Sequence, residues 1–130
     1  MTASQSVTAD VCRSLMRIML VDDHAEMRRL LRSMLHDLAS EFMECADGAE
    51  AVAAFAQHRP DWTIMDITMK DMNGLEATRR IQKQFAGSRI VVLTQHDTPQ
   101  MRAAALQAGA CAFISKDNLA ELDAIIRREL

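Results

Sequence analysis

Acidic, hydroxyl and basic side chains follow directly after short apolar runs of this sequence. The residues in these positions are Asp22, Asp23, Asp66, Thr94 and Lys116. Taken singly, an aspartate after a strand is a common turn former or helix cap. Taken together, three carboxylates, a hydroxyl and an ammonium are the groups needed to bind a cation and to accept and contact a phosphoryl group.

Three carboxylates brought close together repel one another, and burial raises their pKa values unless a positive charge compensates. Mg²⁺ suits this role because it binds through one or two carboxylates, keeps several waters and leaves room for a phosphoryl oxygen. We therefore predict that Asp22 and Asp23 hold the cation and that Lys116 supplies a second, fixed positive charge.

The same set of residues predicts phosphoryl transfer, in which most of the work is positioning and charge neutralisation. Asp66 is the expected nucleophile, because it ends the central strand of the predicted sheet, beside the strand that carries the acidic pair. Thr94 and Lys116 are expected to contact the arriving phosphoryl oxygens.

Short apolar runs, typical of strands, alternate with longer amphipathic segments, typical of helices. The predicted strands are 15–21, 41–45, 62–65, 90–93 and 112–114, and the predicted helices are 27–38, 49–57, 73–87, 98–109 and a last one opened by Asn118. Leu30 is placed on the buried stripe of the first helix. This alternation predicts an α/β fold with a parallel sheet and helices on both faces. Ligands of such sheets bind beyond the carboxyl ends of the strands.

Length and composition favour one globular domain and exclude several classes of protein. The chain has 130 residues, of which 49% are hydrophobic and 25% charged, and a net charge of −3. A net acidic chain without a basic block is a poor candidate for direct nucleic-acid binding. Three cysteines at unrelated spacings and the absence of a signal peptide or membrane-spanning stretch predict a cytoplasmic protein with no membrane contact. We expect a flexible lead-in over 1–13 and a single domain over 14–130.

Four segments resemble the landmarks of the response-regulator receiver domain (CheY-like) of two-component signal transduction. They are Val21-Asp22-Asp23, Met65-Asp66 with Asn73-Gly74, Val91 to Thr94, and Phe113 to Lys116. The resemblance extends over nearly the whole chain, with the four landmarks in the family's order. It implies a doubly wound five-stranded parallel sheet of order 2-1-3-4-5, a flavodoxin-like three-layer (α/β)5 sandwich.

The resemblance also implies a function. A sensor histidine kinase or phosphotransfer protein would donate the phosphoryl group of a phosphohistidine to Asp66. Mg²⁺ would be held by Asp23, Asp66 and the main-chain carbonyl of Thr68, and by Asp22 through water. The chain would be no ordinary enzyme, since its only catalysis would be Mg²⁺-dependent phosphoryl transfer and autodephosphorylation at Asp66.

Receivers of this family act as switches. Thr94 would move toward the phosphoryl group, and Phe113 matches the aromatic residue that then turns inward. The face made by the fourth helix, fifth strand and fifth helix would contact a partner or a second copy of the chain. We expect Met101, Ala105 and Arg127 to contribute to that face.

Two further residues depart from the family pattern near the site. Lys70 stands where the family usually has proline, and the bulky Gln95 follows the switch threonine where a small residue is usual. We expect Gln95 to hinder the donor or the hydrolytic water. A receiver-shaped scaffold that acts by protein contact without phosphorylation therefore remains an alternative.

Other polar residues are interpreted as structural. The four histidines, His24, His36, His58 and His96, show no metal-ligand spacing, and Arg28, Arg29 and Arg32 are predicted to form a solvated helix face. A flavin site would need a glycine-rich phosphate loop after the first strand, where the acidic pair stands. A haloacid-dehalogenase-type phosphatase would need an aspartate at Thr68.

Overall fold

Five strands and five α-helices alternate along the part of the chain that the computed structural model describes, residues 16–69 and 72–129. The strands are β1 (Arg17–Val21), β2 (Glu41–Cys45), β3 (Trp62–Asp66), β4 (Ile90–Thr94) and β5 (Ala112–Ser115). The helices are α2 (Ala25–Leu35), α3 (Gly48–His58), α4 (Gly74–Gln84), α5 (Pro99–Gln107) and α6 (Ala120–Arg128). The expected lead-in over 1–13 and Lys70 lie outside the described residues.

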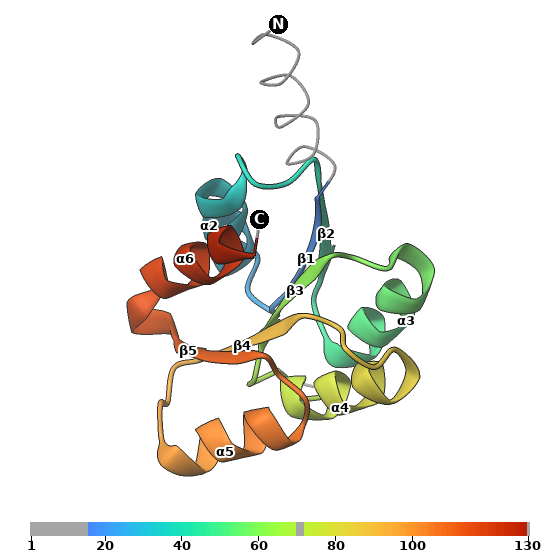
Figure 1. Cartoon of the computed structure of the whole chain (residues 1–130), viewed down its shortest axis with the longest axis vertical. Helices are drawn as coiled ribbons and strands as arrows, with labels where there is room; N and C mark the ends of the chain where they lie inside the picture. The colour runs from blue at the N-terminus through green and yellow to red at the C-terminus, as the bar shows by residue number, and fades with distance from the viewer. Residues whose placement is uncertain (1–15, 70–71, 130) are drawn as a thin grey trace, which may run out of the picture.

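All five strands pair in parallel in the order β2-β1-β3-β4-β5, so the predicted doubly wound fold is confirmed. Helices α2 and α6 cover one face of the sheet, and α3, α4 and α5 cover the other (Figure 1). The central strands are buried on both faces, which explains why their sequences are continuously apolar. None of the described helices has the length and apolar character needed to cross a membrane.

Polar caps begin three of the helices. The side chains of Asp47, Asn73 and Thr98 accept hydrogen bonds from the backbone N–H three residues on, at the start of α3, α4 and α5. The prediction that Asn118 opens the last helix is wrong. Asn118 ends a short 3₁₀ helix (Lys116–Asn118), and α6 begins after Leu119 without a side-chain cap.

The burial predicted for Leu30 is also wrong. Its side chain is 47% exposed, whereas Leu31 and Leu35 of the same helix are buried against the sheet. Leu30 instead lines a surface pocket together with Met27 and Gln95, at the side of α2 that does not pack on the sheet.

The register of the sheet gathers the carboxyl ends of four strands at one edge. Asp66 at the end of β3 pairs with Leu93, the neighbour of Thr94, and Thr94 pairs with Ser115, the neighbour of Lys116. Gly74 at the start of α4 fits tightly beneath this edge, because a Cβ atom there would collide with the main-chain carbonyl oxygen of Asp66. The sheet thus brings together residues separated by up to 94 positions in the sequence.

Candidate functional site

A buried lysine joins two buried aspartates at the carboxyl edge of the sheet. Lys116 Nζ lies 3.1 Å from Asp22 Oδ2 and 3.1 Å from Asp66 Oδ1. The side chains of Asp22 and Asp66 are 1% and 5% exposed, and that of Lys116 is 9% exposed. Since water barely reaches these groups, their mutual attraction is weakly screened.

The electrostatics of this cluster favour a second cation. Burial, together with repulsion from Asp22, raises the pKa of the Asp66 carboxyl above its ordinary value, although Lys116 and a backbone hydrogen bond from Thr68 oppose that rise. Burial on its own would lower the pKa of Lys116, but attraction to Asp66 and Asp22 outweighs it and raises that pKa. One lysine therefore compensates only in part for two buried carboxylates.

Asp23 provides the third carboxylate, beside an exposed histidine. Its Oδ1 atom is buried and forms no hydrogen bond with any described residue, although His24 Nδ1 lies only 2.9 Å away. A buried oxygen without a donor is costly, and a hard cation would satisfy it. Mg²⁺, the cofactor typical of acidic pockets of this kind, therefore fits the residues that are present.

His24 is the residue that the sequence reasoning missed. Its Nδ1 atom lies 2.9 Å from Asp23 Oδ1 and 3.3 Å from Asp22 Oδ1, so the three side chains form one group of possible ligands. The four histidines of the sequence have no metal-ligand spacing relative to one another. The available signal was instead a histidine directly after two aspartates that follow a strand.

A small cavity opens next to Asp66. Its volume is about 60 Å³, and its lining residues are His24, Asp66, Thr68, Gln95 and Lys116. A single water needs roughly 10–15 Å³ of cavity volume, so this cavity has room for an ion with a few waters. Thr68 and Gln95 thus line the cavity beside the candidate phosphoacceptor Asp66.

Thr94 is close to this cavity in the fold but does not line it. Its buried hydroxyl accepts a hydrogen bond from His96 N at 2.9 Å and donates one to His96 O at 3.2 Å. The Thr94 hydroxyl thus forms its hydrogen bonds within its own loop and not with Asp66.

Arg28 is less solvated than predicted. Its Nε donates to Glu44 Oε1 at 2.9 Å, and another guanidinium nitrogen donates to the main-chain oxygen of Asp22. Arg32 pairs with the same glutamate, also at 2.9 Å. These contacts join α2 to β2 and help to fix the backbone at the acidic pair, a role that depends on strand pairing and not on helix periodicity.

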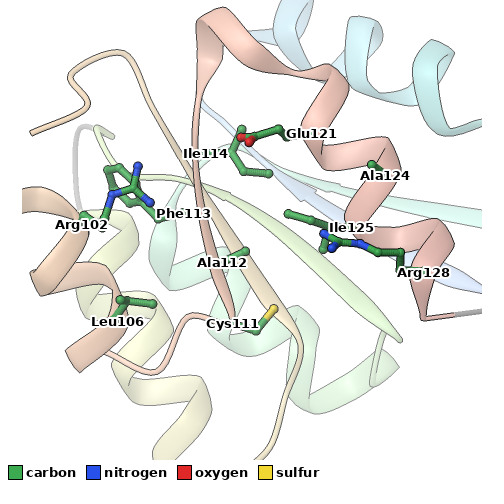
Figure 2. A pocket seen from close by; sticks show the side chains of 10 residues that line it. All are labelled: Arg102, Leu106, Cys111, Ala112, Phe113, Ile114, Glu121, Ala124, Ile125 and Arg128. Atoms are coloured by element: carbon green, nitrogen blue, oxygen red, sulfur yellow. The ribbon is translucent and has the colours of Figure 1, made fainter.

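A groove lies on the face formed by α5, β5 and α6 (Figure 2). These elements are the fourth helix, the fifth strand and the fifth helix of the predicted fold. Its volume is about 350 Å³, and Phe113 lies at one end, with Arg102 beside the ring. Phe113 is 6% exposed and packs in the core with Ala105, which is fully buried.

Two of the residues expected on this face are not available there. Ala105 is fully buried, and Arg127 pairs with Asp37 at 2.9 Å and Asp123 at 2.8 Å. Asp37 follows α2, which covers the same face of the sheet as α6, so the Arg127 side chain links α6 to the end of α2. Met101, in contrast, is partly buried against the core that contains Phe113.

Comparison with known proteins gives one family throughout. A family model described as the response regulator receiver domain matches residues 18–127. The chain is 39% identical over 101 residues to chemotaxis protein CheY of Bacillus subtilis (strain 168), covering 77% of this chain and 84% of CheY. It is 35% identical over 104 residues to response regulator UvrY of Escherichia coli (strain K12), covering 78% of this chain but only 48% of UvrY.

The solved structures agree. The crystal structure of response regulator TrrA from Thermotoga maritima, in complex with Mg²⁺ and BeF, has a TM-score of 0.79 and 29% sequence identity to this chain. The match covers 89% of this chain and 100% of TrrA. The structural similarity therefore extends over most of the chain.

Proposed function

The chain belongs to the response regulator receiver domain family, and from that premise we propose that Asp66 accepts a phosphoryl group in a Mg²⁺-dependent reaction. The donor in this proposal is a phosphohistidine of a sensor histidine kinase or phosphotransfer protein. Receiver domains of response regulators are signalling modules of two-component systems, and this chain is one of them.

One observation carries the proposal: Lys116 lies 3.1 Å from both Asp22 and Asp66 in a buried acidic cluster that has too little positive charge. Asp23, whose buried Oδ1 accepts no hydrogen bond from a described residue, supplies a further carboxylate. In the proposed site, Asp23, Asp66 and the Thr68 main-chain carbonyl bind Mg²⁺ directly, and Asp22 binds it through water. The bound ion would supply positive charge for the phosphoryl oxygens.

The chemistry requires only one attacking oxygen. A carboxylate oxygen of Asp66 forms a P–O bond in line with the P–N bond of the phosphohistidine, which breaks. The electron pair of the broken bond returns to the donor imidazole, which takes up a proton. Lys116 remains beside the new acyl phosphate and compensates for its charge.

The switch follows from the added charge. The phosphoryl group brings about −1.5 to −2 charge and three strong acceptor oxygens to the pocket. In the proposed active state, the Thr94 hydroxyl gives up its hydrogen bond to His96 O and donates to one of these oxygens instead. The loop after β4 then moves, and Phe113 responds to the space that Thr94 leaves. Phosphorylation can shift this equilibrium only by its difference in affinity for the two states.

The output surface of the proposal is the face of α5, β5 and α6, which holds the groove of Figure 2. Leu106 on α5 is 53% exposed beside that groove. A downstream partner or a second copy of the chain would contact this face, with no direct nucleic-acid binding by the domain. We assign the chain to the cytoplasm, where a kinase partner would reach it.

Phosphorylation by a small donor tests the proposal directly. The chain is incubated with acetyl phosphate and Mg²⁺, and the intact mass is measured for wild type, Asp66→Asn and the control Asp117→Asn. Asp117 is an exposed aspartate at the same edge of the sheet. We expect a phosphoryl adduct on wild type and on the control, and none on Asp66→Asn.

An unmodified wild-type chain would contradict the proposal, as would an adduct that forms equally well on Asp66→Asn. The alternative function, a receiver-like scaffold that acts without phosphorylation, is favoured by the exposed Gln95 at the cavity entrance. That alternative predicts no adduct with acetyl phosphate and no beryllofluoride binding in the presence of Mg²⁺.

A further inference from the structure

His24 places a nitrogen ligand among the carboxylates at the acidic edge of the sheet. We propose that His24 is an additional metal ligand, which makes this site favour nitrogen-binding divalent transition metals over Mg²⁺. The inference rests on the proposed function, since it concerns the same cation site, and it identifies a residue that determines which ion the site prefers.

The distances between the possible ligand atoms support shared coordination. Two neighbouring ligands of an octahedral ion with bonds of about 2.0–2.1 Å are separated by about 3.0 Å. His24 Nδ1 lies 2.9 Å from Asp23 Oδ1 and 3.3 Å from Asp22 Oδ1. His24 Nδ1 and Asp23 Oδ1 therefore already have the spacing of two neighbouring ligands of such an ion, and Asp22, which binds through water in the proposed site, lies next to them.

The backbone holds His24 in place while its ring stays accessible. His24 N donates to Asp22 Oδ1 at 2.8 Å, and α2 begins at the next residue. The side chain is 72% exposed, so the imidazole can adjust to a bound ion without disturbing the core. The same ring lines the cavity beside Asp66 and Thr68.

The contact between His24 and Asp23 is at ion-pair distance but is not a hydrogen bond. The two atoms are 2.9 Å apart, and Asp23 Oδ1 forms no hydrogen bond with a described residue. An ion bound by both atoms would satisfy the buried oxygen and use the nitrogen lone pair at once.

The chemistry of the ligand set determines the preference. Mg²⁺ binds oxygen ligands and gains little from an imidazole. Imidazole suits Ni²⁺, Cu²⁺ and Zn²⁺, and affinity for such sites rises from Mn²⁺ to Cu²⁺. An all-oxygen site would also bind Ni²⁺ more tightly than Mg²⁺, so the diagnostic quantity is the part of that preference that depends on His24.

Calorimetric titration of the full chain with Ni²⁺ and with Mg²⁺ tests the inference. The variants are His24→Ala and the matched control His96→Ala, which removes an exposed loop histidine that is absent from the group of ligand atoms and from the cavity lining. We expect His24→Ala to weaken Ni²⁺ binding at least about tenfold, a loss typical even of residues that only support a ligand. Mg²⁺ affinity should change little, and His96→Ala should match wild type for both ions.

Competition confirms that both ions occupy one site, since saturating Mg²⁺ should raise the apparent Kd for Ni²⁺ in the wild-type chain. Equal Ni²⁺ affinity in wild type and His24→Ala would overturn the inference, and so would parallel losses of Ni²⁺ and Mg²⁺ affinity, which would make His24 a support of the pocket. If the wild-type chain failed to bind Mg²⁺ but still bound Ni²⁺ through His24, the proposed function would fail and the inference would stand.

Discussion

The guanidinium of Arg102 lies over the ring of Phe113, with 5.0 Å between its central carbon and the ring centroid. The same guanidinium pairs at 3.2 Å with Asp97, which lies in the loop that follows Thr94. One exposed side chain of α5 therefore connects the loop after β4 to the aromatic residue of β5. This connection lies at the rim of the groove in Figure 2.

The first prediction concerns the strength of this contact. Because Arg102 is half exposed, we expect its interaction with Phe113 to contribute about 0.5–1 kcal/mol to the free energy of unfolding. A double-mutant cycle of Arg102→Leu and Phe113→Leu, measured by urea unfolding, isolates that coupling. The exposed ion pair with Asp97 should add little, so Asp97→Asn serves as the control. A coupling energy of zero would show that the ring is held without Arg102.

The second prediction concerns the pH dependence of stability. The pKa of Asp66 is raised in the folded chain, so the native state holds this proton more tightly than the unfolded state. Ionised Asp66 therefore lowers the free energy of unfolding as pH rises from the ordinary carboxyl pKa through the folded pKa. In the presence of a chelator, Asp66→Asn should stabilise the chain by about 0.5–2 kcal/mol at neutral pH.

Urea unfolding at a series of pH values checks this prediction, with Asp117→Asn as the exposed control. The gain from Asp66→Asn should shrink toward zero as pH falls below the ordinary aspartate pKa of about 3.9, because the wild-type carboxyl is then protonated in both states. Mg²⁺ added above its Kd should stabilise wild type in proportion to the logarithm of the Mg²⁺ concentration. This stabilisation should narrow the difference in unfolding free energy between wild type and Asp66→Asn. If the stability gained by Asp66→Asn grew at low pH, the raised pKa assigned to Asp66 would be contradicted.

The third prediction concerns access to Asp66. Gln95 is exposed and lines the small cavity beside Asp66 and Thr68. Truncation to alanine removes bulk from that entrance, so Gln95→Ala should speed either phosphorylation by acetyl phosphate or loss of the phosphoryl group. Both rates are followed by intact mass, with Gln100→Ala, an exposed change on α5, as the control. Rates equal to wild type in both directions would mean that Gln95 does not limit access.

The fourth prediction concerns the backbone beneath the phosphoacceptor. A Cβ atom at Gly74 would collide with the Asp66 carbonyl oxygen, so Gly74→Ala should cost about 1–3 kcal/mol and displace Asp66. Asn73→Ala removes the adjacent cap, at about 1 kcal/mol, without filling that space. Both variants should lose stability in urea, but only Gly74→Ala should also slow phosphorylation by acetyl phosphate. Equal phosphorylation in the two variants would remove the steric role assigned to Gly74.

Much of the fold was predictable because its signals are local. Apolar runs predicted four of the strands, and the more polar run Glu41 to Cys45 predicted β2. Asn73 and Thr98 predicted two helix starts that the structure confirms. The predicted start of the last helix was wrong because Asn118 lies in a 3₁₀ helix. Whether such a residue caps an α-helix or ends a 3₁₀ helix depends on the neighbouring segments of the fold and not on the capping pattern alone. The burial of Leu30 failed for a related reason, since periodicity gives a face but not its width.

In the site, the positions of the residues were predictable but their side-chain contacts were not. The order of polar residues after the apolar runs, combined with the rule that parallel strands end at one edge, was enough to bring Asp22, Asp66 and Lys116 together in prediction. The orientation of each side chain was not predictable. Lys116 reaches across 94 positions to Asp22, Thr94 bonds within its own loop, and His24 turns toward Asp23. Such contacts depend on strand register and on burial in three dimensions, because a side chain in a short sequence segment carries no information about the distant atoms that will compete for it.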